Sequence, residues 1–132
     1  MMGMKSNENQ VNSSQDKGQD QLSKIYGIKI ESINLTMRGG MIDLRYRIVD
    51  TKAAKQVVTQ HSKIDISLID KKSGQVIKVA ESDIGKLMAR SPRLYPNRRF
   101  FILFENPHGM VKAGSEVSIV FGSVKIDGWK IE

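Results

Sequence analysis

The chain has 132 residues, no cysteine and a formal net charge of +7. That length suits one domain with a hydrophobic core of its own. The lack of cysteine excludes a disulfide framework, a thiol nucleophile and any cysteine-based zinc or iron–sulfur site. No apolar run approaches the ~20 residues that a membrane-spanning helix needs, so we expect no transmembrane segment.

The N-terminal segment differs in composition from the rest of the chain. Residues 1–24 are rich in Ser, Asn, Gln, Asp and Lys, and they offer too little apolar surface to offset their ordering entropy. We expect a disordered polar linker over 1–24 and a folded domain over 25–132. No apolar stretch of a signal peptide follows Met1. Either the protein is cytoplasmic with a disordered tail, or it is an envelope protein whose export signal is not part of this sequence; the linker favours the second.

The first strand is predicted over residues 26–37. Its apolar residues change parity near Glu31 and Ser32, which indicates a β-bulge. Arg38-Gly39-Gly40 follows and predicts a hairpin turn, because paired glycines supply positive φ without steric cost.

A second strand, a short helix and a hairpin follow. Residues 41–49 alternate between apolar and polar side chains, as in a strand with one face in water. Asp50 is placed to cap a helix over 51–58, which we expect to cross from one sheet to the other. Residues 63–70 and 75–79 predict two strands of a hairpin. Residues 80–96 are expected to be irregular, because two prolines exclude a central strand.

The richest apolar stretch lies near the C-terminus. Residues 100–104 form an uninterrupted apolar run, and residues 116–121 alternate. All four phenylalanines of the chain fall in these two segments, so we expect them to be the central, buried pair of strands. Gly122 is expected at a bend, and Trp129 at or near a terminal strand.

These elements amount to about seven short strands with very little helix. The pattern predicts an all-β fold, an immunoglobulin-like antiparallel β-sandwich with one or two short helical turns. A small barrel, such as an oligonucleotide-binding fold, is the alternative.

The excess positive charge falls on the predicted domain, and its densest run spans residues 86–99 without an acidic residue. Arginine suits anion binding, because its planar fork engages carboxylate or phosphate with two hydrogen bonds, and tyrosine adds a stacking surface. We predict that this loop binds an anionic partner through Lys86, Arg90, Arg93, Tyr95, Arg98 and Arg99. The alternative is a solvated loop whose arginines pair with nearby carboxylates.

Catalytic and metal-binding spacings are missing from the sequence. There is no nucleophile elbow, phosphate loop, zinc-protease helix or calcium-loop spacing. Imidazole and thioether ligands would suit Cu(I), but we expect His108 to be a turn residue and the methionines to fill gaps in the core. We therefore expect a protein that is not an enzyme and has no metal or other cofactor.

Two segments carry a resemblance to known proteins. The run Phe101 to Pro107, with Gly109, Val111-Lys112, Gly114 and Val117, resembles a group of small bacterial proteins, as does Leu44 to Asp50. Members of that group look like single β-rich domains with an export or lipoprotein signal, and the motif carries no known chemistry. The resemblance covers residues 26–132. It implies an envelope location and supplies no catalytic residues.

The leading hypothesis is a non-catalytic periplasmic or envelope-tethered module. It would act by protein–protein contact, as an accessory or assembly subunit with an acidic or envelope-located partner. The alternative is a cytoplasmic nucleic-acid-binding barrel that uses the 86–99 loop together with Arg45 and Arg47.

Overall fold

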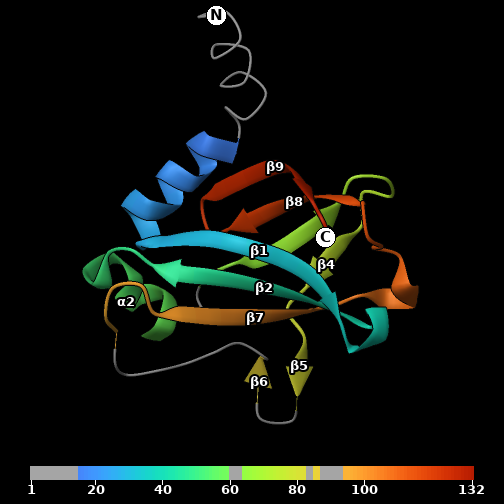
Figure 1. The fold of residues 1–132 in the computed structure, drawn as a ribbon, viewed down its shortest axis with the longest axis horizontal. Coiled ribbons are helices and arrows are strands. Elements are labelled where there is room, and N and C mark those ends of the chain that lie inside the picture. The colour runs from blue at the N-terminus through green and yellow to red at the C-terminus, as the bar shows by residue number, and fades with distance from the viewer. Residues whose placement is uncertain (1–14, 60–63, 83–84, 87–93) are drawn as a thin grey trace, which may run out of the picture.

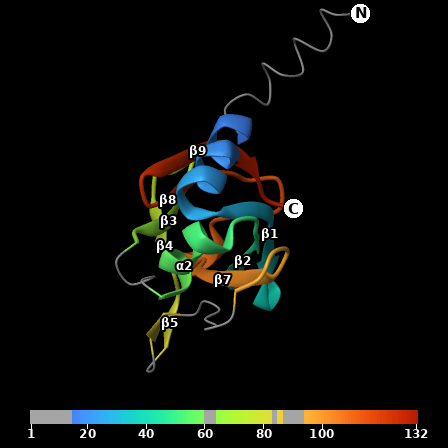
Figure 2. The ribbon, with the colours of Figure 1, turned by 90° about the vertical axis from the view of Figure 1, so that its left-hand side faces the viewer.

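The computed structural model describes residues 15–59, 64–82, 85–86 and 94–132. Within these residues the strands form one antiparallel sheet of three strands and one of four, with a separate two-stranded hairpin. The two larger sheets pack face to face, as the edge-on view in Figure 2 shows. The prediction of an all-β fold is therefore confirmed.

The three-stranded sheet, here sheet A, faces the viewer in Figure 1. It contains β1 (Ile28–Thr36), β2 (Met41–Ile48) and β7 (Arg99–Glu105) in the order β1-β2-β7. The predicted bulge is confirmed, because the β1–β2 register shifts between Ile30 and Ser32. Along β2 the side chains alternate as predicted, with those of Ile42, Leu44, Tyr46 and Ile48 fully buried.

The turn between β1 and β2 is the 3-10 turn η1 (Met37–Gly39). Its position was predicted, but the glycines do not share the positive φ angles as expected. Gly39 takes φ +86, whereas Gly40 takes φ −78, and Met37 and Arg38 adopt φ +53 and +56. The left-handed conformation thus falls partly on residues with side chains, which is a strained choice for methionine.

The four-stranded sheet, sheet B, has the order β4-β3-β8-β9. Its strands are β3 (Ile66–Asp70), β4 (Val76–Lys78), β8 (Glu116–Phe121) and β9 (Val124–Lys130). The small hairpin of β5 (Glu81–Ser82) and β6 (Gly85–Lys86) lies in the stretch that we expected to be irregular.

Helix α2 (Thr51–Thr59) carries the chain from β2 to sheet B. The predicted cap is confirmed, because Asp50 Oδ1 accepts a hydrogen bond from the backbone N–H of Lys52 at 3.0 Å. The 3-10 turn η3 (Pro107–Gly109) lies between β7 and β8.

The prediction of two central phenylalanine-rich strands is confirmed for β8, which lies inside sheet B, and is wrong for β7, which lies at the edge of sheet A. β7 pairs with β2 and β8 pairs with β3, so the two strands lie in different sheets. β7 is the last strand of sheet A, with a single bridge from Val79 to Phe104 at its far side. Phe100 and Phe104 are buried, but Phe101 between them is half-buried on the outer face. An uninterrupted apolar run in a strand still alternates between faces.

Residues 15–26 form a helix, which corrects the expectation of a disordered linker for residues 15–24. Residues 1–14 lie outside the described part. The Leu22 side chain is fully buried and Tyr26 is 7% exposed, so the helix belongs to the core. It lies along β1 and beside β9 (Figure 1). The Gln19 amide donates to the carbonyl of Ile30 at 2.8 Å and accepts from its N–H at 3.0 Å, as a neighbouring strand would.

The helix approaches β9 closely at Gly18. A Cβ atom at this position would overlap Cγ1 of Ile126, whose side chain is fully buried. A second close approach occurs at Gly122, in the turn between β8 and β9. Gly122 has φ +59, and a Cβ there would overlap the hydroxyl of Tyr26. That hydroxyl accepts the backbone N–H of Ser123 at 3.0 Å.

The core between the sheets contains a cluster of aromatic rings. Tyr46 lies 5.8 Å from Phe100 and 6.4 Å from Phe121, measured between ring centroids. The Tyr46 hydroxyl is buried and has no hydrogen-bond partner among the described residues. Burial raises the pKa of this hydroxyl far above its usual value.

Candidate interaction surface

The described part of the predicted basic loop is held against the end of β2. The N–H of Asn97 donates to the carbonyl of Ile48 at 2.8 Å, and the carbonyl of Arg98 accepts the N–H of Ile48 at 2.9 Å. The Arg98 guanidinium lies 5.2 Å from the ring centre of Tyr95 and 5.1 Å from that of Phe100. Tyr95 is 54% exposed, so the structure brings together one exposed ring and one cation.

Arg99 points from the outer face of sheet A and belongs to a row of cations. Lys29 in β1 is paired with Arg47 in β2, and Arg47 is paired with Arg99 in β7. Directly paired residues in neighbouring strands place their side chains on the same face. Three cationic side chains therefore cross the outer face of sheet A side by side, and we call Lys29, Arg47 and Arg99 the cationic row.

Among the described residues, Glu31 is the carboxylate that forms ion pairs with the cationic row. Its Oε1 accepts a hydrogen bond from Nε of Arg99 at 2.7 Å, and its Oε2 lies 4.0 Å from Nε of Arg47. The longer distance is a Coulombic contact and not a hydrogen bond, so the buried Nε of Arg47 lacks a hydrogen-bond partner among the described residues. Glu31 thus offsets part of the positive charge of Arg47 and Arg99.

Arg45, the next outward residue of β2, is engaged locally. Its Nη2 lies 2.9 Å from Oδ2 of Asp43, and its guanidinium lies 5.7 Å from the ring centre of Phe101. The hydrogen bond with Asp43 raises the pKa of Arg45. Arg45 therefore stays protonated, and the carboxylate of Asp43 offsets its charge.

The remaining predicted residues are not gathered with this row. Lys86 lies in β6, in the hairpin that projects below the sheets in Figure 1. Arg90 and Arg93 lie outside the described residues. The structure thus joins Tyr95 to Arg98 and brings Arg99 to the cationic row, while Lys86 belongs to another surface.

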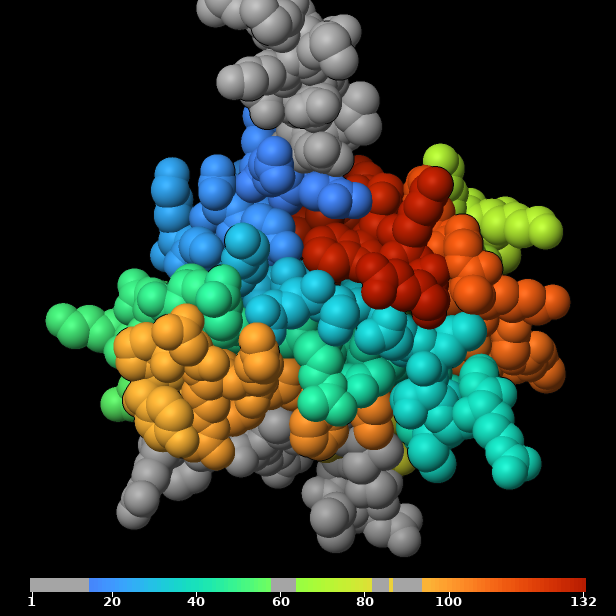
Figure 3. All heavy atoms as spheres, in the orientation of Figure 1, coloured from blue at the N-terminus to red at the C-terminus, as the bar shows by residue number. Residues whose placement is uncertain are grey.

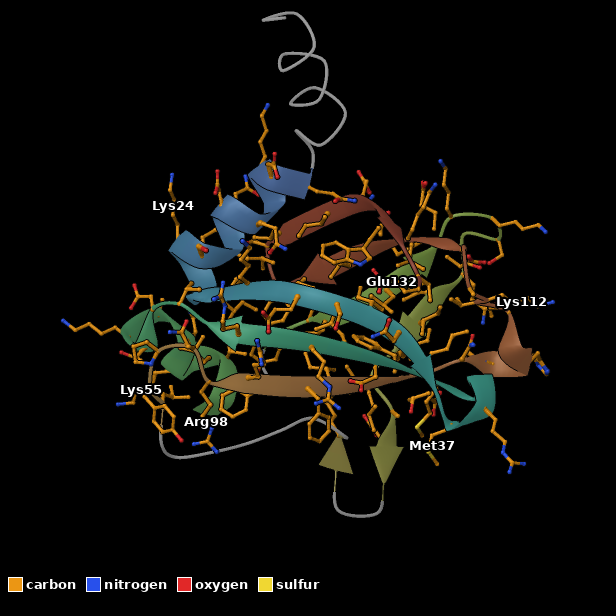
Figure 4. The ribbon with its side chains drawn as sticks, in the orientation of Figure 1. Lys24, Met37, Lys55, Arg98, Lys112 and Glu132 are labelled. Carbon is orange, nitrogen blue, oxygen red and sulfur yellow. The ribbon has the colours of Figure 1, made fainter. Side chains whose placement is uncertain are left out.

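The sequence did not indicate which basic residues from distant parts of the chain lie near this surface. Lys24, Lys55 and Arg98 project from the same end of the molecule (Figure 4), and residues 94–99 form a continuous surface with the β2–α2 segment there (Figure 3). Lys29 and Arg47 join Arg99 only through strand pairing. The alternation of apolar and polar residues along β2 placed Arg47 on the solvent-exposed face of its sheet. No local signal indicated which residues of the neighbouring strands lie beside it.

Other kinds of site are not formed by the described residues. No three His, Asp or Glu side chains among them gather closely enough to hold a metal ion. None of the helices in residues 15–59 and 94–132 has the length and apolar character needed to cross a membrane. Comparison of the chain with protein-family models, with curated proteins and with solved structures finds no match.

Proposed function

We propose that this protein is a non-catalytic immunoglobulin-like module of the bacterial envelope that binds an acidic protein partner, as an accessory or assembly subunit. The observation that carries the proposal is the cationic row of Lys29, Arg47 and Arg99 across the outer face of sheet A. Tyr95 and Arg98 extend this surface at the end of β2.

The order of the strands supports the immunoglobulin-like assignment. If the seven strands of the two sheets take the letters A, B, C, C′, E, F and G, sheet A reads A-B-E and sheet B reads C′-C-F-G. In immunoglobulin-type sandwiches strands A, B and E likewise share one sheet and strands C, F and G the other. The hairpins β1–β2, β3–β4 and β8–β9 agree with this assignment.

A binding role accounts for an arrangement that weakens the sheet. Like charges that face each other across neighbouring strands are destabilising, by a few tenths of a kcal/mol or about 1 kcal/mol each. Sheet A has two such pairs, Lys29 with Arg47 and Arg47 with Arg99, and Glu31 is the carboxylate that partly compensates for them. An acidic partner would supply the missing negative charge and would be steered toward this face.

The envelope location rests on composition and resemblance. Residues 1–14 are rich in Ser and Asn, and an envelope location would agree with the resemblance to exported bacterial proteins that we predict for segments 44–50 and 101–117. Fractionation of cells that express the native gene with a C-terminal tag tests this part of the proposal. Recovery in the cytoplasmic fraction would contradict it.

A charge-reversal pair tests the binding face. The double variant Arg47→Glu and Arg99→Glu is compared with Lys78→Glu and Lys125→Glu, which make the same change in net charge on two strands of sheet B. After chemical cross-linking in intact cells, the wild type and the sheet B variant are expected to capture the same acidic protein, and the sheet A variant is expected to lose it. Equal capture by both variants would refute the role of the cationic row.

Nucleic acid is the second candidate, favoured by the exposed Tyr95 ring stacked with Arg98. Fluorescence anisotropy with single- and double-stranded 20-mers, over about 50 to 200 mM salt, separates the two functions. Affinity that falls steeply with salt over this range would support nucleic-acid binding, because bound phosphates release counterions. No binding at the lowest salt would remove this candidate.

A further inference from the structure

A groove that does not include Arg47 or Arg99 lies where the N-terminal helix meets the sandwich. In Figure 3 the helix (blue) and β9 (dark red) lie side by side above β1. The groove between them has a volume of about 490 Å³. That value lies within the range of roughly 300–1,000 Å³ typical of small-ligand sites.

Two glutamines of the helix fix the shape of the groove. Gln15 Nε2 donates to the carbonyl of Gly128 at 2.7 Å, and the Gln19 amide is paired with the backbone of Ile30. These contacts tie the helix to β9 and to β1 at the same time. Both ends of the Gln19 amide and Nε2 of Gln15 are engaged in holding the helix, so most of the polar groups that remain for a ligand belong to other residues.

The single tryptophan of the chain lines the groove. Trp129 follows Gly128, which has φ +75, in the part of β9 where pairing with β8 becomes irregular. Its side chain is partly buried and packs against the core. A ring held in this way offers a rigid apolar surface to a ligand without a large loss of side-chain entropy.

The rim of the groove carries short polar side chains and one cation. Asp16, Asp20 and Ser23 are four and three residues apart, so they share one face of the helix. Lys29 reaches the groove from the outer face of β1. Ionised carboxylates only accept hydrogen bonds, an ammonium only donates them, and a hydroxyl does both.

This set of groups defines the ligand by elimination. A phosphate-rich ligand would be repelled by the two carboxylates. A purely apolar ligand would remove water from the carboxylates without offering them hydrogen bonds in return. The ligand that fits has closely spaced groups that both donate and accept, together with one apolar face. A neutral pyranose ring has these properties, since its hydroxyls surround a face of C–H groups. We propose that the groove binds a neutral saccharide, with one ring stacked on Trp129 and its hydroxyls bonded to Asp16, Asp20 and Lys29.

Two other hollows on the surface lack the feature that carries the proposal. One, of about 420 Å³, lies beside the β5–β6 hairpin, and another, of about 400 Å³, lies beside Met110. Neither is lined by an aromatic side chain. They therefore offer charged and aliphatic groups without a platform for a sugar ring.

Trp129 is also the reporter for the test, because the full chain has no other tryptophan. Its fluorescence is titrated with three hexamers, one of a neutral hexose, one of an N-acetylhexosamine and one of a hexuronic acid. We expect a saturable emission change with one of the first two and none with the acidic hexamer, which Asp16 and Asp20 repel. No saturable change with any hexamer, or a change with the acidic one alone, would overturn the proposal.

Variants assign the signal to the groove. Asp16 and Asp20 are exposed, so we expect the double change to Asn to keep the fold, which circular dichroism checks. It is expected to weaken binding at least tenfold, because neutral amides replace charge-assisted acceptors. The Lys78→Glu variant, which changes a residue of β4 that does not line the groove, is expected to bind the hexamer like the wild type. Undiminished binding by the Asn variant would place the sugar elsewhere and refute the assignment.

Discussion

Asn106 is the buried polar residue whose replacement tests the structure most sharply. It is 5% exposed and follows β7. Its Nδ2 donates to the carbonyls of Gly39 and Val111, each at 2.9 Å, and its Oδ1 accepts the N–H of Val111 at 3.0 Å. One side chain thus joins the turn after β1 to the turn after β7. Asn106→Asp keeps the shape and the acceptor but removes both donors.

The expected loss follows from those contacts. Each of the two lost hydrogen bonds is worth about 1 kcal/mol, and the groups left unpaired add about 1–3 kcal/mol. We expect Asn106→Asp to lower the free energy of unfolding by about 3–5 kcal/mol at pH 7, a large share of the 5–15 kcal/mol typical of a domain.

The same substitution should make stability depend on pH. The introduced carboxyl lies between two carbonyl oxygens, so its pKa in the folded state rises above the ~3.9 of the unfolded state. Because the folded pKa is raised, the contribution of the protonated carboxyl to the free energy of unfolding is fully present below pH ~3.9. That contribution is lost as the pH rises through the folded pKa. The loss relative to wild type should therefore be smaller at pH 4 than at pH 7, by at least about 1.4 kcal/mol.

Urea unfolding followed by circular dichroism and Trp129 fluorescence measures this loss, with the wild type run at each pH. The matched control is Asn97→Asp, because Asn97 is exposed and its Oδ1 already accepts from Nη1 of Arg47 at 3.4 Å. The control should change stability by less than about 0.5 kcal/mol. A loss below about 1 kcal/mol for Asn106→Asp at pH 7, or an equal loss at both pH values, would refute the role assigned to this side chain.

Removing the unpartnered hydroxyl in Tyr46→Phe should be neutral or stabilising in urea unfolding, whereas Tyr26→Phe should cost about 1 kcal/mol, because it leaves the N–H of Ser123 unpaired. Because the pKa of Tyr46 is raised in the folded state, the stability that its neutral hydroxyl contributes is present below pH ~10 and is lost above it. Raising the pH above ~10 should therefore destabilise the wild type by up to about 1.4 kcal/mol per pH unit more than Tyr46→Phe. Parallel plots of unfolding free energy against pH for the two proteins would contradict this. Gly18→Ala should destabilise by about 1–3 kcal/mol, despite a helix propensity gain of about 1 kcal/mol, because its Cβ overlaps Ile126. An unchanged or raised urea midpoint for Gly18→Ala, with Gln21→Ala on the exposed face as control, would show that the helix can shift.

Part of the candidate surface was readable from local charge. The run from 86 to 99 singled out Tyr95, Arg98 and Arg99, and the structure places all three near the end of β2 or on sheet A. The partners of Arg99 were not readable, because a one-residue change of register would have moved Lys29 and Arg47 to the other face. Register depends on which strands pair, and no local pattern in β7 indicates that β2 is its neighbour.

The sequence by itself determined the elements whose signals are local. Alternation indicated β2, a change of parity indicated the bulge in β1, and Asp50 indicated the start of α2, because backbone geometry and capping act over a few residues. Only the tertiary structure decided that residues 15–26 form a helix and that β7 and β8 belong to different sheets. That helix is held by Leu22 in the core and by glutamine amides on distant backbone groups, and such contacts exist only after the sheets have formed.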